Sequence, residues 1–233
     1  MPTRADALVV MAKAPIAGAV KTRLMPFLSA EEAAELAQAL LLDQLDHRCS
    51  LGSADLYLAF APPDAGALMA PLAPAPFALF PQTGGDLGAR MERIFESLFA
   101  AGYRKIILIG SDLALVPPTY FNQAFAYLDG PQQRVVLGPS QDGGYYLVGL
   151  NQRTPSMFEN MSWSHDRVLA QSVAKLAALG VPSLQLPSWF DIDTPDDLRS
   201  FALRSKTSPV SAGKNTSRLL RRLEVDKRRG ADR

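Results

Sequence analysis

The sequence has little of what several classes of site require. It contains one cysteine, Cys49, and two histidines, His47 and His165. It can therefore form no intramolecular disulfide and no zinc site built from thiolates and imidazoles. A metal in this protein would be held by carboxylates, which favour hard ions such as Mg²⁺ or Mn²⁺. No Ser, His and Asp stand in an order that predicts a hydrolase triad.

Long hydrophobic runs are also missing. The longest early run, residues 7–12, ends at Lys13 and falls short of the roughly 20 residues that span a membrane. It also lacks the length and the small-residue cleavage site of a secretory signal. We therefore expect a cytoplasmic protein without a transmembrane segment.

Net charge is nearly absent, but it is unevenly distributed. The 233 residues carry 24 Lys and Arg against 23 Asp and Glu. Residues 1–201 hold 14 basic and 20 acidic side chains, whereas residues 202–233 hold 10 and 3. We expect one domain over residues 1–204 and a mobile basic extension over residues 205–233, in which residues 218–229 have the pattern of a short amphipathic helix. The extension has no aromatic side chain to stack on bases, so no specific nucleic acid is expected to bind.

Apolar runs alternate with helical patterns along the rest of the chain. Strands are predicted at residues 7–11, 55–60, 77–80, 105–109, 134–137, 145–150 and 183–186. Helical patterns separate most of them, and a capping box of Ser29 and Glu32 begins the first helix. This order predicts a three-layer α/β/α fold with a mostly parallel, Rossmann-like sheet. Ligands bind such sheets at the carboxyl ends of the strands.

Four segments that follow predicted strands have the composition of a ligand site. The first is the loop of residues 13–24, KAPIAGAVKTRL. Small residues let backbone N–H groups approach an anion, and cationic side chains neutralise it. The spacing is not that of a Walker A loop, and a solvated loop with scattered charges is the alternative. The residues that we expect to bind nucleotide phosphates here are Lys13, Ala14, Pro15, Gly18, Lys21 and Arg23.

The second segment, residues 82–91 or QTGGDLGARM, places two glycines at the start of a helix. A helix N-terminus with a flexible backbone suits contact with a base, a ribose or a phosphate. Gln82, Gly85 and Asp86 are therefore further nucleotide-binding candidates. The alternative for Asp86 is that it only caps the helix.

The third segment is Gly110-Ser111-Asp112, which follows the most apolar strand. A carboxylate at this position suits a divalent metal over a diphosphate, and a turn-forming role is the alternative. Late in the chain, Asp191 and Asp193 alternate in an extended segment and so point to one face. Asp196 and Asp197, which follow Thr194-Pro195, fit the capped first turn of a helix.

The fourth segment is the loop between two predicted strands, residues 138–146 or GPSQDGGYY. A plain hairpin turn is the alternative for its Asp-Gly-Gly sequence. Tyr145 and Tyr146 alternate, so one should face the core and the other the crevice.

Together these segments resemble the GT-A-type nucleotide-diphospho-sugar transferase superfamily. Within it, they resemble a bacterial family of cofactor-guanylyltransferase-like glycosyltransferases of the radical-SAM- and selenodomain-associated, arsenosugar-biosynthesis type. The resemblance spans residues 7–201 and rests on MAKAPIAGAVKTRL, QTGGDLGARM, GSD, GPSQDGGYYLVGL and DIDTPDDL. The chain departs from the family at Ala114, where proline is usual, and at Trp163-Ser164-His165, where Trp-Ser-Thr is usual.

The resemblance implies a role for each segment. The first loop and Ser111 would bind the nucleotide, and Asp112 and Asp193 would bind Mg²⁺ or Mn²⁺. The sugar or acceptor would contact Asp142, Gly143, Gly144, Tyr145 and Trp163.

Our leading hypothesis is a metal-dependent glycosyltransferase that uses a nucleotide-diphosphate sugar and a small-molecule acceptor. Lys21, Arg23 and Asp112 would then stabilise the leaving diphosphate. One alternative is a nucleotidyltransferase that joins an NTP to a phosphorylated acceptor and releases pyrophosphate. Another is a non-catalytic nucleotide-binding protein. The base, the sugar, the acceptor, the stereochemical outcome and the oligomeric state stay open.

Overall fold

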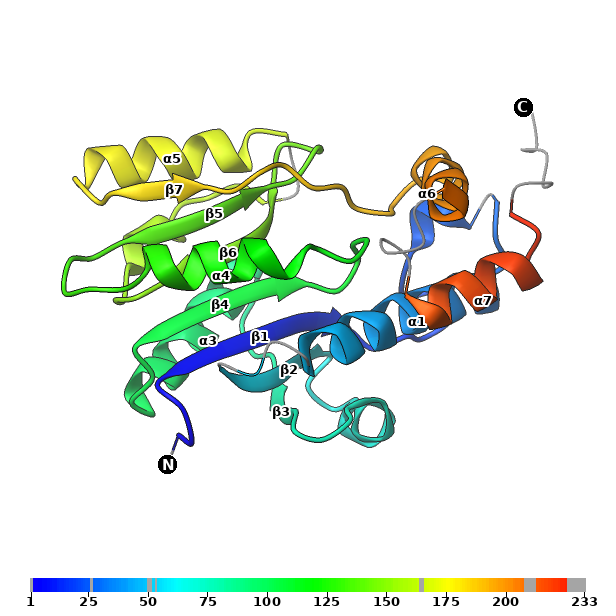
Figure 1. Ribbon diagram of the computed structural model, residues 1–233, viewed down its shortest axis with the longest axis horizontal. Helices are drawn as coiled ribbons and strands as arrows, with labels where there is room; N and C mark the ends of the chain where they lie inside the picture. Colours follow the sequence, from blue (N-terminus) through cyan, green and yellow to red (C-terminus); the bar gives the residue numbers. More distant parts are fainter. Residues whose placement is uncertain are drawn as a thin grey trace.

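A seven-stranded sheet forms the centre of the computed structural model (Figure 1), which describes residues 2–25, 27–49, 52, 54–163, 166–207 and 213–225. The strand order is β3-β2-β1-β4-β6-β5-β7. Strand β6 is antiparallel to both of its neighbours, and every other pair is parallel. The strands are β1 (Asp6–Lys13), β2 (Asp55–Ala61), β3 (Ala78–Pro81), β4 (Lys105–Gly110), β5 (Val135–Pro139), β6 (Tyr145–Leu150) and β7 (Ser183–Gln185).

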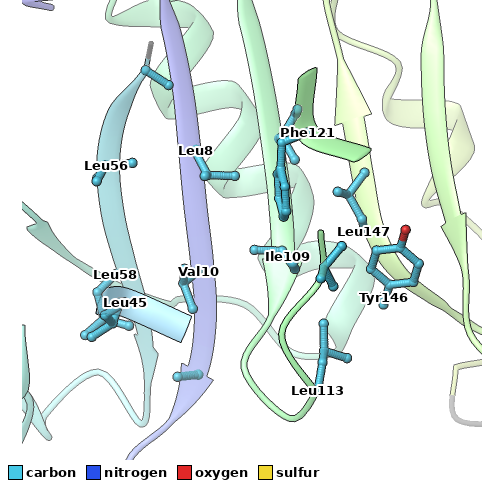
Figure 2. Close-up of a cluster of buried hydrophobic side chains, with 14 of the residues drawn as sticks. Leu8, Val10, Leu45, Leu56, Leu58, Ile109, Leu113, Phe121, Tyr146 and Leu147 are labelled. Atoms are coloured by element: carbon cyan, nitrogen blue, oxygen red, sulfur yellow. The ribbon is translucent and has the colours of Figure 1, made fainter. Parts of the chain in front are cut away.

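Helices cover both faces of the sheet, which confirms the predicted three-layer α/β/α fold. On one face, α1 (Ala30–Cys49) and α4 (Pro118–Tyr127) pack over alternate strand residues such as Leu8 and Val10. Figure 2 shows this cluster, with Leu45 of α1 and Phe121 of α4 directed at the strands. On the other face, Ala7 and Val9 meet α3 (Leu87–Ala100) and α5 (Val168–Ala178). The alternation follows from the two-residue period of a strand, and burial of these apolar side chains stabilises the fold.

The start of α1 has the predicted capping box. The Ser29 backbone N–H donates to Glu32 Oε2 at 2.9 Å, and the Glu32 N–H donates to Ser29 Oγ at 3.2 Å. Short helical segments occupy several connections: η1 (Thr22–Leu24), α2 (Gly66–Met69), η2 (Ala70–Leu72) and η3 (Pro155–Met157). Among the described residues, no helix is both long and apolar enough to cross a membrane.

A third apolar cluster lies beyond the carboxyl edge of the sheet. It joins the first half of α1 to α6 (Pro195–Thr207) and α7 (Lys214–Arg222), and it includes Leu36, Phe201 and Leu220. Figure 1 shows α7 running beside α1. The predicted short amphipathic helix therefore exists, over residues 214–222 instead of 218–229.

The docking of α7 differs from the expected mobile extension. Asp43, a buried carboxylate on α1, accepts the backbone N–H groups of Asn215 at 2.9 Å and Thr216 at 2.8 Å. Residues 213–225 are consequently part of the folded body, because the helix has a polar anchor and buried leucines. Residues 208–212 and 226–233 of the predicted extension lie outside the described residues.

Candidate active site

A cleft of about 510 Å³ opens at the carboxyl edge of β1 and β4. Because these strands are parallel neighbours, the segments that follow them leave the sheet side by side. The antiparallel β6 begins at the same edge, so the loop that precedes it also reaches the cleft. The lining residues are Lys13, Val20, Lys21, Thr22, Arg23, Ala37, Ser111, Asp112, Asp142, Asp166 and Asp193.

Lys21 lies at the floor of this cleft with only 2% of its side chain exposed. Its ammonium group is 3.1 Å from Asp112 Oδ1 and 2.9 Å from Asp193 Oδ1. It also donates to the carbonyl oxygen of Ile192 at 2.8 Å. Burial lowers the pKa of Lys21, but the charges of the two carboxylates outweigh burial, so the pKa is raised above its usual value. Lys21 is therefore a buried cation that joins two acids from distant parts of the chain.

The two acidic segments are also joined through their backbones. The Ile192 N–H donates to the carbonyl of Asp112 at 3.0 Å, and Leu113 forms an antiparallel bridge with Asp191. The carboxyl groups themselves stay accessible, since the side chains of Asp112 and Asp193 are 52% and 40% exposed. The predicted pairing of Asp112 with Asp193 at one site thus has a direct geometric basis.

Asp191 is a further acid beside this pair. Burial, followed by the negative charges of Asp142 and Asp193, raises the pKa of Asp191 to about 7. Its alternation with Asp193 was visible in the sequence, but the sequence assigned it no role. Asp166 was missed entirely, because no strand end or glycine loop precedes it.

The donor set of the cleft fits a hard divalent cation. Among the described residues, no group of three or more His, Cys, Asp or Glu side chains is arranged to hold a metal ion. Magnesium sites that act on nucleotides often use only one or two protein carboxylates, with substrate phosphates and water as the other ligands. Asp112 and Asp193 match that pattern. Their role as metal ligands stays a prediction.

A second cavity of about 260 Å³ adjoins the cleft between the sheet and α3, and it shares Lys13, Ser111 and Asp112 with it. Its other walls are largely apolar and include Met11, Leu87 and Met91. Gln82 is buried there and donates to the carbonyl of Ala59 at 2.8 Å, so its side chain is fixed. Both tyrosines also line it: Tyr145 packs toward α3, and Tyr146 is buried in the cluster of the opposite face.

The Asp-Gly-Gly loop is a hairpin turn and also part of the cleft. Strands β5 and β6 pair directly on either side of it. Asp142 Oδ1 accepts the N–H of Gly144 at 3.0 Å and the hydroxyl of Ser140. Gly143 has φ +86°, and a Cβ there would lie 2.0 Å from the carbonyl oxygen of Asp166. Only glycine allows this close approach, which brings Asp142 and Asp166 into one wall.

Several predicted site residues lie elsewhere. Asp86 caps α3, with Oδ1 accepting the N–H of Ala89 at 2.8 Å. Trp163 packs edge-on against Tyr145 and so close to Gly88 that a Cβ there would lie 2.5 Å from its ring. Ser164 and His165 lie outside the described residues. The predicted residues that line neither cavity are Ala14, Pro15, Gly18, Gly85, Asp86, Gly143, Gly144 and Trp163.

The chain belongs to the DUF2064 family, which is described as an uncharacterised protein conserved in bacteria, and residues 44–165 match its family model. No match was found among curated proteins.

Solved structures show the same fold. A protein from Desulfovibrio desulfuricans G20, provisionally described as a nucleotide-diphospho-sugar transferase, is 31% identical with a TM-score of 0.87, over 95% of this chain and 96% of that one. A cytidylyltransferase from Leptospira borgpetersenii serovar Hardjo-bovis is 10% identical with a TM-score of 0.56, over 99% and 100% of the two chains. A CMP:2-keto-3-deoxy-manno-octonic acid synthetase solved with CTP is 12% identical with a TM-score of 0.51, over 87% and 99%. The first match supports the predicted superfamily, and the other two show the fold alone.

Proposed function

We propose that the chain is a transferase that binds a nucleotide-diphosphate sugar in the cleft and transfers the sugar to a small-molecule acceptor. The observation that carries this proposal is the buried Lys21 between Asp112 and Asp193, with Lys13 and Arg23 lining the same cleft. The 31% identical relative, described as a nucleotide-diphospho-sugar transferase, supports it.

The cationic side of the cleft suits the diphosphate. Lys13 and Arg23 can approach phosphate oxygens from the rim, while Lys21 holds the two carboxylates in place. Asp112 and Asp193 would hold Mg²⁺ or Mn²⁺. The bound ion would neutralise the negative charge that develops on a leaving diphosphate. The adjoining apolar cavity is large enough for part of a nucleoside, which would enter beside Met11 and Leu87.

The far side of the cleft favours glycosyl transfer over nucleotidyl transfer. Charge changes sign along the sheet edge, from Lys13 and Arg23 after β1 to Asp142 and Asp166 beyond β4. A phosphorylated acceptor would meet these carboxylates and be repelled, whereas hydroxyl groups can donate hydrogen bonds to them. The arsenosugar-type activity suggested by the sequence resemblance is compatible with such an acceptor and is part of this proposal.

Nucleotidyl transfer to a phosphorylated acceptor is the second candidate. It is favoured by the cytidylyltransferase fold of the Leptospira structure. In that reaction an NTP would enter and pyrophosphate would leave, so the two candidates differ in the nucleotide that binds.

Isothermal titration calorimetry with NTPs, NDPs and nucleotide sugars, each with Mg²⁺ or Mn²⁺, tests the proposal. We expect an NDP and its sugar to bind, and Asp112→Ala to weaken that binding by about 10- to 100-fold, as loss of metal-site support typically does. Asp129→Ala, an exposed acid near the opposite edge of the sheet, is the control. Tight NTP binding with pyrophosphate release would overturn the proposal of glycosyl transfer. Unchanged nucleotide binding by Asp112→Ala would show that Asp112 is not part of the binding site.

A further inference from the structure

Two polar side chains on the inner face of α1 are completely buried. Gln44 and Arg48 lie one turn apart, and both are 0% exposed. A buried guanidinium is costly unless it is well hydrogen-bonded. Within the described part of the chain, no carboxylate forms an ion pair with Arg48. Its Nη2 donates to Gln44 Oε1 at 2.7 Å, and its guanidinium carbon lies 4.0 Å from the centre of the Phe121 ring.

The amide of Gln44 is directed at the segment that follows Asp112. Its Nε2 donates to the carbonyl of Leu113 at 3.0 Å and to that of Ala114 at 3.3 Å. Arg48 Nη1 reaches the carbonyl of Val116 at 3.5 Å. Arg48 fixes the amide orientation of Gln44, so the two residues form one network beneath residues 113–116.

The same segment is held from the other side by the chain that carries Asp193. Trp189 Nε1 donates to the carbonyl of Ala114 at 3.1 Å, and the Ile192 N–H donates to that of Asp112. Residues 112–116 are therefore clamped between α1 and residues 189–193. Ala114 is central to this clamp, since it is 1% exposed and its carbonyl accepts from both Gln44 and Trp189.

We propose that Gln44 and Arg48 are positioning residues that set the place of Asp112 relative to Asp193, and thereby the affinity of the pair for a cation. Neither residue lines the cleft. They act on it through the backbone of residues 113–116, as outer hydrogen bonds orient the ligands of many metal sites. That these two residues matter for catalysis rests on the function proposed above. That they set the position of Asp112 does not.

Hydrogen exchange measured by mass spectrometry tests the geometric part without any ligand. Gln44→Met removes both amide donors and keeps an unbranched side chain of similar size. We expect faster exchange in peptides covering residues 112–116 and 189–193. Asp43→Asn is the matched control: it changes a buried polar residue one position away on α1, and we expect its effect at residues 213–217 instead. If Gln44→Met fails to fold, Arg48→Lys, which keeps the charge but cannot hold both partners, is expected to give the same pattern.

Binding of Mn²⁺ alone, followed by electron paramagnetic resonance, tests the functional part. We expect Gln44→Met to weaken Mn²⁺ binding by about 10- to 100-fold and Asp43→Asn to leave it unchanged. Equal effects of the two variants, or faster exchange without weaker Mn²⁺ binding, would overturn the positioning role. A wild-type protein that binds neither Mn²⁺ nor any nucleotide would overturn the proposed function instead. The positioning of Asp112 would then be tested by hydrogen exchange alone.

Discussion

At the scale of single residues, Lys21 balances the charges of the cleft. Replacing it by Met leaves Asp112 and Asp193 side by side with no cation between them. We expect Lys21→Met to lower the free energy of unfolding by about 1–3 kcal/mol in the absence of divalent ions, and Mn²⁺ to restore part of the loss. Thermal denaturation with and without Mn²⁺ measures both effects.

Lys105→Met is the matched control for this prediction. Lys105 also contacts two acids, Asp6 at 3.2 Å and Asp129 at 3.4 Å, but away from the cleft. We expect Mn²⁺ to give no recovery there. Equal recovery in the two variants would show that the ion acts without a site between Asp112 and Asp193.

Asp191 gives the stability of the protein a pH dependence. Its folded-state pKa is raised to about 7, chiefly by burial, whereas an unfolded aspartate titrates near pH 3.9. The folded state therefore binds the proton more tightly, and stability is lost as pH rises from about 4 to about 7. Asp191→Asn cannot ionise, so we expect its melting temperature to rise relative to wild type between pH 5 and pH 8 in EDTA. Parallel curves over that range would contradict the assignment.

At the scale of elements, the docking of α7 depends on a close contact at Gly213, the N-cap residue that precedes the helix. A Cβ at Gly213 would lie 2.1 Å from the carboxyl carbon of Asp43, which caps the helix. We expect Gly213→Ala to destabilise the protein by about 1–3 kcal/mol and to speed hydrogen exchange over residues 214–225. Gly85→Ala is the control, because a Cβ there meets nothing within 4 Å. An equal loss of stability in both variants would mean that the Asp43 contact is not what holds α7.

The strands were predictable because apolar runs mark them directly. Residues 145–150 were predicted and observed as a strand with the same bounds, and the other strands differ by one or two residues at their ends. The antiparallel direction of β6 follows from the hairpin turn that the Asp-Gly-Gly sequence offered as an alternative. The docking of α7 was not predictable, because it depends on the distant residue Asp43 lying alongside, and no local pattern encodes that.

At the scale of the whole molecule, the parallel sheet explains why part of the site was predictable. Segments that follow β1 and β4 meet at one edge, so Lys13, Lys21 and Asp112 were expected together, and they line one cleft. The burial of Lys21 was not visible in the sequence, where it stands among exposed cations. Trp163 was assigned to the acceptor side by resemblance, and that role stays a prediction. Its packing on Gly88, where the ring fills the space that the glycine leaves, was not visible in the sequence.

The arrangement of the apolar clusters predicts one cooperative unit. Leucines of α7 share a cluster with α1 and α6, and α1 also packs on the sheet. We expect far-ultraviolet circular dichroism and the exchange of α7 amides to report the same unfolding transition in urea. A separate early transition, absent from a chain ending at residue 207, would show that α7 unfolds on its own.

The contact between Lys21 and Asp193 joins residues 172 positions apart. During synthesis, the early loop and β1 leave the ribosome long before the second carboxylate exists. Forming a contact over so long a separation is slow compared with forming local helices. Burial of the Lys21 charge is unfavourable until both carboxylates are present to pair with it. The cleft is consequently completed only after Asp193 has been synthesised, so a shorter chain carries the cationic loop without the two carboxylates that hold Lys21.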